Sequence, residues 1–281
     1  ENKELILSQN FFNHPYEVIF RSFSDSINLI GGKRNMVRGK KIDYILLKIR
    51  NNSFKQATLG GCIIKKLNQT VIISKEKNNQ NLFLVCVDLM KNTSTKKIIN
   101  IIKKLRLNPN SLINNARNLE HSKLDKNGKP STKNFLNEFK LGVVVPYEFT
   151  QALVAAFPGK FKNVLNISSI YGSVAPNKKL YKNSYKKSPI QYGVTKSAVE
   201  HLTKELSVRL AKKSIRVNCV AFGGVEGRVS KAFMKRYAEL CPSGRMLTED
   251  EIFNPIEFLI SNKTSGITGH VLMVDGGWTV W

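Results

Sequence analysis

The amino-acid sequence predicts an α/β fold built on a doubly wound parallel sheet. From residue 82 onward, short apolar runs with strand character alternate with longer runs of helical period. The short runs are apolar throughout, as in strands that are covered on both faces. The length of 281 residues fits one large domain or two small ones. We therefore expect a single Rossmann-like domain at residues 56–281, preceded by an atypical segment at residues 1–55.

The N-terminal segment contains three candidate strands, at residues 18–23, 27–32 and 42–49, which could be the first strands of the sheet. Gly60 and Gly61 follow, ahead of a predicted helix at residues 63–67 and a predicted strand at residues 70–74. Glycines before a helix can present backbone N–H groups to a phosphate. A plain turn is the alternative for this pair.

Eight further elements are predicted after residue 82. They are strands at residues 82–89, 111–115, 163–168, 215–220 and 270–274, and helices at residues 93–105, 134–157 and 192–212. The last helix is the clearest, because Val199, Leu202, Leu206 and Leu210 recur at helical spacing. Pro146 should interrupt the helix at residues 134–157.

The chain is strongly basic, since 45 Lys and Arg residues against 20 Asp and Glu residues give a formal charge of +25. Such a field attracts phosphates, nucleic acid or acidic proteins, although a general enrichment in lysine explains it equally well. Two windows are basic without an acid, at residues 31–41 and 177–187, and both are predicted loops. The second window has five lysines interleaved with Tyr181 and Tyr185. It fits an anionic substrate, nucleic acid or a solvated loop.

Cysteine and histidine usage indicates neither a metal site nor a disulfide framework. The four cysteines, Cys62, Cys86, Cys219 and Cys241, form no C-x-x-C pair, and the four histidines are isolated. We infer a reducing compartment and expect the protein in the cytoplasm. No apolar run is long enough to span a membrane, and residues 1–4 lack the features of a secretory signal. The first residue is Glu and not Met, so the sequence leaves open whether a leader peptide has been removed.

Tyr192 and Lys196 are the strongest candidates for chemistry. Four residues apart on a helix, they lie on one face about one turn from each other. A cation near a phenol favours the phenolate and lowers the phenol's pKa, which makes the phenol a usable acid or base. Ser168 and Ser169 end a predicted strand, where a hydroxyl can enter the ligand cleft of a parallel sheet.

Five segments in order resemble the short-chain dehydrogenase/reductase family. They are NNA at 114–116, NISSIYG at 166–172, YGVTK at 192–196, IRVN at 215–218 and GITGHVLMVDGG at 266–277. Further segments are similar to the bacterial flagellin-modification protein A group, whose members act in nonulosonic sugar pathways. These are VAP at 174–176, SPI at 188–190, GGVEGR at 223–228 and GGWTVW at 276–281.

The resemblance implies three catalytic residues. Tyr192 would be the general acid/base, Lys196 would lower its pKa and hold the nicotinamide ribose, and Ser169 would hydrogen-bond the substrate oxygen. The helical asparagine of the family is not evident here: Gly142 lies near its position, and Asn137 is the nearest candidate.

The resemblance also implies an NAD or NADP cofactor. Residues expected to contact it, besides Tyr192 and Lys196, are Gly60, Gly61, Lys75, Asp88, Asn114, Ala116, Gly223 and Val225. The family's Thr-Gly-x-x-x-Gly-x-Gly turn is absent from the sequence, so Gly60 and Gly61 are the closest substitute. If residues 70–74 are the second strand of the sheet, Lys75 suits the 2′-phosphate of NADP.

We therefore expect an NAD(P)-dependent oxidoreductase that acts on a hydroxyl or keto group of a small anionic, sugar-derived substrate. One alternative is a 3-oxoacyl-carrier-protein reductase, because an acidic carrier would also favour a basic rim. Another is a non-catalytic scaffold that binds RNA or an acidic protein. The resemblance implies a homo-oligomer, and the apolar end of the chain at residues 278–281 indicates Trp281 at or near the interface.

Overall fold

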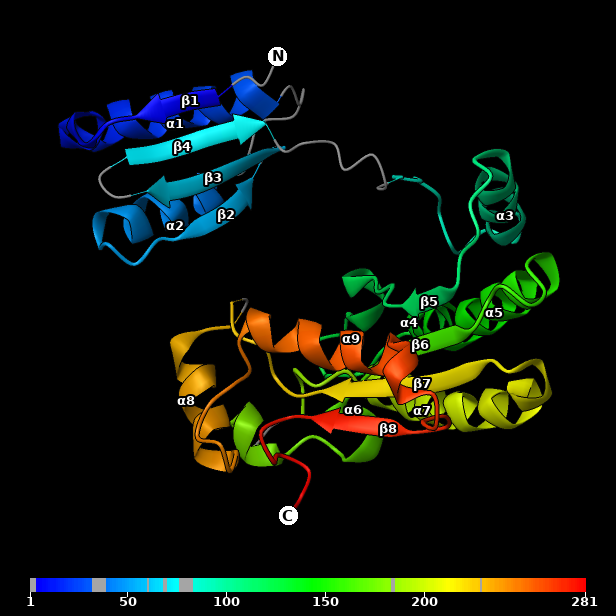
Figure 1. Ribbon diagram of the computed structural model, residues 1–281. Coiled ribbons are helices and arrows are strands. Elements are labelled where there is room, and N and C mark those ends of the chain that lie inside the picture. Colours follow the sequence, from blue (N-terminus) through cyan, green and yellow to red (C-terminus); the bar gives the residue numbers. More distant parts are fainter. Residues whose placement is uncertain are drawn as a thin grey trace. The chain divides into compact units, whose positions relative to one another are not determined.

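The computed structural model describes residues 4–31, 39–59, 61–67, 70–75, 83–182, 185–227 and 229–281. The chain forms two compact units, Glu1–Leu84 and Val85–Trp281 (Figure 1). The boundary predicted after residue 55 falls inside the first unit. Residues 56–75 belong to that unit because their strands pair with one another and with the strand that opens the chain.

In its described residues, the first unit consists of a four-stranded antiparallel sheet and two α-helices. Its elements are β1 (Glu4–Leu7), the 3-10 helix η1 (Gln9–Asn13), α1 (Tyr16–Gly31), α2 (Gly39–Arg50), β2 (Gln56–Leu59), β3 (Cys62–Leu67) and β4 (Thr70–Lys75). The strand order is β1-β4-β3-β2. One continuous core joins both helices to the sheet. The first unit therefore has a sheet and a hydrophobic core of its own.

The three candidate strands of the N-terminal segment are wrong in the described residues, because helices cover residues 18–23, 27–31 and 42–49. In α1, Ile19, Phe23 and Ile27 recur every fourth residue and are completely buried. In α2, Ile42, Ile45, Leu46 and Ile49 make a similar buried stripe. A helical period was therefore present in the sequence, but it extends across the borders of the short apolar runs.

The second unit contains the predicted parallel sheet. Its strands are β5 (Ser111–Asn114), β6 (Asn163–Ser169), β7 (Arg216–Phe222) and β8 (Val271–Val274), in the order β5-β6-β7-β8 and all parallel. Its α-helices are α3 (Ser94–Lys104), α4 (Thr132–Phe139), α5 (Val145–Ala156), α6 (Ile170–Ser173), α7 (Ile190–Leu210), α8 (Lys231–Leu240) and α9 (Phe253–Ile260). A π-helical turn, η3 (Lys140–Val144), joins α4 to α5. Short 3-10 helices are η2 (Leu119–Ser122), η4 (Lys178–Tyr181), η5 (Ala211–Lys213), η6 (Glu249–Ile252) and η7 (Asn262–Thr264).

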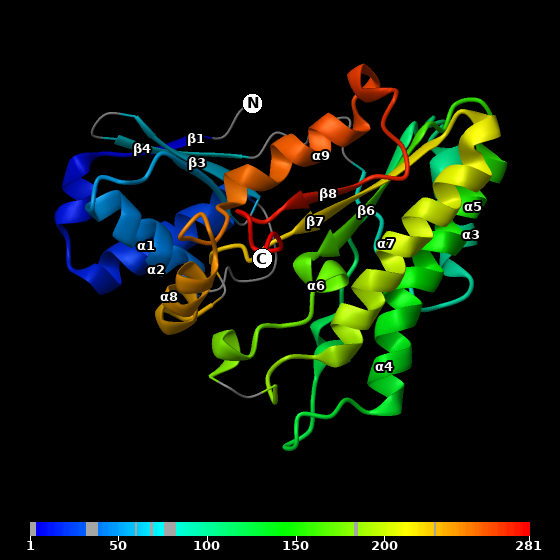
Figure 2. The same ribbon diagram turned by 90° about the horizontal axis from the view of Figure 1, so that it is seen from below.

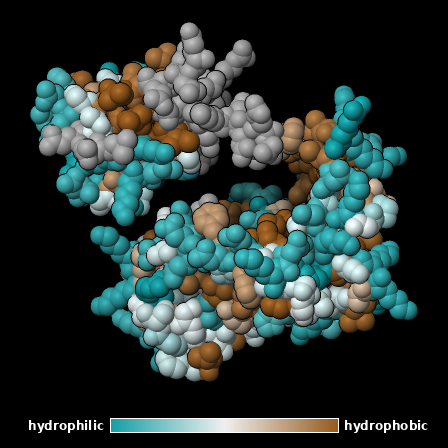
Figure 3. Space-filling model, in the orientation of Figure 1, coloured by the Kyte–Doolittle hydropathy of each residue, from teal (hydrophilic) through white to brown (hydrophobic). Residues whose placement is uncertain are grey.

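Helices cover both faces of the parallel sheet. In Figure 2 the strands run between α9 on one side and α3, α4, α5 and α7 on the other. Adjacent residues of β6 point into different cores: Val164 faces the core shared with α5 and α7, and Leu165 faces the core shared with α9. This three-layer arrangement confirms the predicted doubly wound α/β fold. Hydrophilic side chains cover much of the face of this unit seen in Figure 3.

The strand predicted at residues 82–89 is wrong in the described part of the chain. Residues 83–88 have no regular secondary structure, and Leu84 is 88% exposed. The apolar character of this run predicts burial on both faces, but burial requires neighbouring strands. Strands β1–β4 pair only with one another among the described residues, so they provide no such neighbour.

The long helix predicted at residues 134–157 is present as α4, η3 and α5. Pro146 is the second residue of α5, where its missing N–H costs little, and the π-helical turn lies directly before it. The helix predicted at residues 192–212 begins slightly earlier, as α7. Within the described residues, no helix has the length and apolar character that crossing a bilayer demands.

Candidate active site

The predicted catalytic residues meet at the carboxyl edge of the parallel sheet. Asn114 and Ser169 are the last residues of β5 and β6, and α7 packs against β6 and β7. In open α/β sheets this edge is the place where ligands bind. The Ser168 hydroxyl contacts the Lys196 carbonyl oxygen at 3.3 Å, which fixes the end of β6 beside α7.

The Tyr192 ring contacts two cations. The Lys196 Nζ lies 5.6 Å from the ring centroid, and the Arg117 guanidinium carbon lies 4.1 Å from it. Arg117 follows β5 in the chain, and its Nη2 also donates to the Ser122 hydroxyl at 3.3 Å. The predicted Tyr–Lys pair is therefore assembled, and Arg117 completes a group of three.

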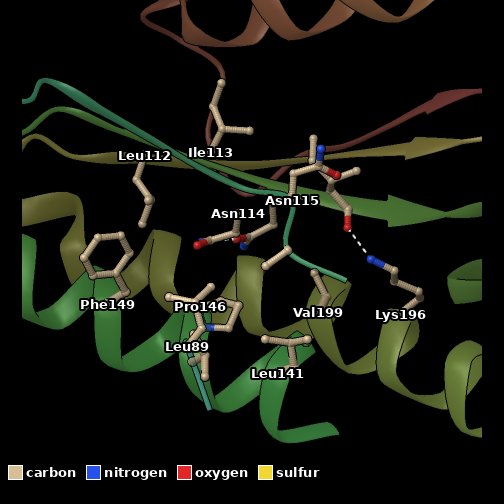
Figure 4. A pocket seen from close by; sticks show the side chains of 15 residues that line it. Leu89, Leu112, Ile113, Asn114, Asn115, Leu141, Pro146, Phe149, Lys196 and Val199 are labelled. Atoms are coloured by element: carbon tan, nitrogen blue, oxygen red, sulfur yellow. Dashed lines mark hydrogen bonds between the residues drawn. The ribbon is translucent and has the colours of Figure 1, made fainter. Parts of the chain in front are cut away.

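Burial strongly affects the Lys196 ammonium. Together with the nearby Arg117 charge, it lowers the pKa of Lys196 to about 8. The ammonium donates to the Ile167 carbonyl oxygen at 2.7 Å, the hydrogen bond drawn in Figure 4. This bond positions the charge beneath the sheet edge. Lys196 is thus held in place but is easier to deprotonate than an ordinary lysine.

The two serines at the end of β6 have different partners. The Ser168 hydroxyl donates to the Glu200 carboxylate at 2.8 Å. The Ser169 oxygen accepts the Tyr171 N–H at 3.3 Å and caps α6, so its own proton is available to a substrate oxygen. Of the two, Ser169 therefore has the geometry that a substrate-binding hydroxyl needs.

A cavity of about 110 Å³ lies beside this edge (Figure 4). Its polar lining comes from Asn114, Asn115, Asn166 and Lys196, and its apolar lining comes from β5, η3, α5, β6, α7 and the turn before α3. Asn114 donates to Asn166 at 2.8 Å, and Asn166 donates to Thr203 of α7 at 2.9 Å. Ala116 also lines this cavity. Asn114, Ala116 and Lys196 thus share one cavity, as expected for residues that contact one ligand.

Gly223 and Val225 follow β7 at the same edge. A Cβ on Gly223 would lie 2.8 Å from the Tyr237 hydroxyl and 2.9 Å from the Asp275 Cα, so only glycine fits between these neighbours. Val225 is held by a parallel bridge to Leu247. The chain leaving β7 is therefore fixed on both sides.

The remaining predicted cofactor residues that the structure describes are Gly61, Lys75 and Asp88. Gly61 has a φ of 80° at a turn that leads into β3, so a strand follows it instead of the predicted helix. Lys75 ends β4 and pairs with Cys62 in the antiparallel sheet. Gly60 lies outside the described residues. Asp88 lies in the turn before α3, where its carboxylate accepts the Met90 N–H at 3.0 Å.

The basic window at residues 177–187 is anchored at one end. Leu180 is completely buried, and its carbonyl oxygen accepts Arg236 Nε at 2.9 Å. The Tyr181 hydroxyl lies 2.8 Å from that of Tyr171, just after Ser169. Lys178, Lys179 and Lys182 are exposed. The structure thus ties this loop to the α6 end of the site and leaves these three lysine side chains exposed.

Sequence reasoning missed two charged residues, Arg117 and Glu138. Arg117 directly follows the Asn-Asn-Ala segment, where a side chain at a strand end can enter the cleft. Glu138 is only 5% exposed and shares a helical stripe with Leu141 and Val145. The acidic residue in an otherwise apolar helical stripe was the sequence feature that could have indicated a buried carboxylate. Burial raises the pKa of Glu138, against the opposing effects of Arg117, Lys196 and His121.

Comparison with known proteins identifies the family. A family model described as "Enoyl-(Acyl carrier protein) reductase" matches residues 62–279. The chain belongs to the short-chain dehydrogenase/reductase family. The family expected from the sequence is therefore confirmed. Most of the matched range is the second unit, although its first residues form β3 and β4 of the first unit.

Relatives of this short-chain dehydrogenase/reductase resemble only part of it. "Post-translational flagellin modification protein A" of Campylobacter coli is 36% identical over 118 residues, 42% of this chain and 46% of that protein. A 3-oxoacyl-carrier-protein reductase of Chlamydia muridarum is 36% identical over 120 residues, 41% of this chain and 44% of that protein. The chain spans about half the length of these curated relatives.

One similar solved structure is the crystal structure of a short-chain dehydrogenase from Leptospira borgpetersenii with bound NAD+. It is 27% identical with a TM-score of 0.63, and the match covers 69% of this chain and 74% of that one. The second unit therefore shares the fold of a protein that binds a dinucleotide.

Proposed function

We propose that this protein is an NAD(P)-dependent oxidoreductase that interconverts a hydroxyl and a keto group on an anionic, sugar-derived substrate. The observation that carries this proposal is the Tyr192–Lys196 pair at the carboxyl edge of the sheet, with Ser169 at the end of the neighbouring strand. Tyr192 gives or takes the proton of the reacting oxygen, and Ser169 donates a hydrogen bond to that oxygen. When bound, the dinucleotide supplies or accepts the hydride.

The described residues fit the nicotinamide end of such a cofactor. Asn114, Ala116 and Lys196 line one cavity, and Lys196 carries the donors that a ribose needs. The pyrophosphate end is not matched in the described part of the second unit, where no glycine-rich turn leads from a strand into a helix ahead of β5. We therefore expect weaker dinucleotide binding than a complete cradle would give.

Titration with NADH and NADPH, followed by calorimetry, tests this proposal most directly. We expect saturable binding of at least one of them, and Lys196→Ala should weaken it. A dissociation constant above about 1 mM, or less than about 4 kcal/mol of binding free energy, would favour the non-catalytic scaffold instead. The charge of +25 would then bind RNA or an acidic protein, and a filter-binding assay would test for binding of RNA.

Positive charge near the site supports an anionic substrate. Arg117 stacks on Tyr192, and the exposed Lys178, Lys179 and Lys182 follow the α6 end of the site. Reversing these three lysine charges should raise KM for an anionic substrate and leave kcat nearly unchanged, as loss of uniform binding does. An unchanged KM would make this a solvated loop.

A 3-oxoacyl-carrier-protein reductase is the second candidate. The Chlamydia muridarum relative carries that activity in its name, and an acidic carrier would also bind a basic rim. Comparing turnover of a keto-sugar acid with that of an acyl-carrier substrate separates the two.

Cys219 and Cys241 are buried free thiols, which supports our assignment of the protein to the reducing cytoplasm.

A further inference from the structure

Four buried polar side chains lie between η2, α4 and α7, next to the catalytic pair. They are His121, Glu138, Gln191 and Thr195, which are 7%, 5%, 0% and 1% exposed. Each has one buried polar atom without a hydrogen-bond partner in the protein: His121 Nδ1, Glu138 Oε2, Gln191 Oε1 and Thr195 Oγ1. We call these four residues the buried polar cluster.

Three elements are locked together around this cluster. Gln191 Nε2 donates to the His121 carbonyl oxygen at 2.9 Å, which ties α7 to η2. Gly142, one turn after Glu138, lies against Thr195, so α4 and η3 reach α7 at the same level. Lys196 follows Thr195 directly. The cluster is therefore part of the wall behind the active site.

A polar atom left unpaired in the interior destabilises the fold, because it loses the hydrogen bonds that it makes with water in the unfolded chain. Buried water commonly satisfies such groups when two or more of them share a space. Burial raises the pKa of Glu138, and Arg117, Lys196 and His121 oppose that rise. The groups that act on Lys196 are Arg117, Cys219, Glu138 and Glu200, so the two residues influence each other.

We propose that Glu138 is the buried counter-charge of the active site. Its carboxylate, buried in this cluster beside α7, favours the charged form of Lys196, while the Arg117 guanidinium lies over the Tyr192 ring. Two cations beside one phenol repel each other, and a carboxylate behind them offsets that repulsion. Glu138 is thus a positioning residue that acts through Lys196, and its catalytic consequence rests on the proposed function.

The first test needs no cofactor or substrate. The full chain is labelled with acetic anhydride across a pH series, and mass spectrometry of the Lys196 peptide gives the pH of half-labelling. Glu138→Gln should lower that pH by about half a unit or more, because it removes a negative charge near the ammonium. Glu120→Gln is the matched control, since Glu120 is an exposed acid of η2.

Arg117→Gln should move the half-labelling pH of Lys196 upward, because it removes a like charge. An unchanged pH in folded Glu138→Gln overturns the proposal. If Glu138→Gln does not fold, Glu138→Leu removes the same charge from the apolar stripe that Glu138 shares with Leu141 and Val145, and an unchanged pH in that variant also overturns the proposal.

In turnover assays, the alkaline limb of the kcat profile should move to lower pH in Glu138→Gln. Glu138→Asp should restore most of the wild-type profile, which a purely structural role would not require. If the wild type shows no hydride transfer, the proposed function fails, but the labelling result still decides the role of Glu138. A labelling shift without an effect on the kcat profile would remove the catalytic part of this inference.

Discussion

The chemistry of this chain depends on how single side chains alter the charge of their neighbours. Tyr192 contacts both Lys196 and Arg117, and the pKa of Lys196 is lowered to about 8 by burial and by Arg117. Ser168 is occupied by Glu200, whereas Ser169 keeps its proton available. Neighbouring residues of the same type thus have different tasks because of the partners that folding gives them.

Replacing Tyr192 with Phe should abolish hydride transfer and leave the fold unchanged. The substitution removes one hydroxyl from a half-buried position and nothing from the core. We expect a loss well beyond tenfold in kcat, which corresponds to more than about 1.4 kcal/mol in activation free energy. Tyr185→Phe, at a 52% exposed position, is the matched control. Retention of a tenth of wild-type turnover would contradict the proton-transfer role.

Lys196→Met should stabilise the second unit near pH 7 and abolish activity. The folded pKa of Lys196, about 8, lies below its usual value of 10.5, so below pH 8 the fold carries the full cost of a buried charge. Between pH 8 and 10.5 only the unfolded chain binds that proton, and wild-type stability rises with pH. We expect the variant to gain about 1–3 kcal/mol at pH 7 and less at pH 9.5.

Urea denaturation followed by tryptophan fluorescence measures this gain, because Trp278 and Trp281 both belong to the second unit. Lys204→Met, at an exposed position of the same helix, is the control. An equal stability difference at both pH values would show that the charge of Lys196 carries no such cost.

At the scale of elements, the approach of α4 and η3 to α7 determines the shape of the wall behind the site. A Cβ on Gly142 would lie 2.4 Å from the Thr195 Cγ2, so any larger residue pushes the two helices apart. Gly142 lies near the position at which the resemblance places the family's helical asparagine, and here it allows the two helices to pack closely. Gly142 lies in the π-helical turn, where the inserted residue lets the helix bend.

Gly142→Ala should destabilise the second unit by about 1–3 kcal/mol through overpacking. It should also reduce turnover, because α7 carries Tyr192 and Lys196. Thr195→Ser removes the methyl group that the new Cβ would meet, so the double variant should recover part of both losses. Gly266→Ala is the control, with no atom within 4 Å of the added Cβ. Purely additive effects of the two substitutions would contradict a direct contact.

At the scale of the whole molecule, the chain consists of two units with separate cores. In the first unit an antiparallel sheet packs against α1 and α2. In the second unit a parallel sheet lies between two layers of helices. Residues 83–88, around the boundary, have no regular secondary structure. The division into units therefore coincides with the change from antiparallel to parallel pairing.

Limited digestion with chymotrypsin should cut first after Phe83 or Leu84, which are 45% and 88% exposed. Local exposure and missing hydrogen bonds make such a segment the easiest to cleave. Mass spectrometry should find two fragments that resist further digestion, and circular dichroism should change little. Simultaneous degradation of both fragments would contradict independent cores.

We expect a homo-oligomer with the end of the chain at or near its interface. Trp278 is not a surface residue, because it stacks on Tyr237 with ring centroids 4.3 Å apart. Val280 and Trp281 remain 76% and 80% exposed. Light scattering should show an oligomer for the intact chain and a smaller species after Val280→Ser with Trp281→Ser. A monomeric intact chain at micromolar concentration would refute this expectation.

The amino-acid pattern alone predicted strands β5–β8, helices α3, α4, α5 and α7, and the placement of Tyr192 beside Lys196. These features depend on local patterns: β6 and β7 are continuous apolar runs, and Tyr192 and Lys196 lie one helical turn apart whatever the rest of the chain does. The order of the family segments then brings Asn114, Ser169 and Tyr192 to one sheet edge, because parallel strands end on the same side.

The elements of the first unit, the irregular structure of residues 83–88 and the charged groups around Tyr192 could be assigned only from the folded chain. A run such as residues 83–88 becomes a strand only if another strand lies beside it, and that partner can come from any part of the chain. Strand β3 pairs with β2 and β4. Arg117 and Glu138 are distant from Tyr192 in sequence, and their influence on the site follows from contact and burial. Such interactions join residues that are far apart in the sequence, so the local hydrophobic pattern does not predict them.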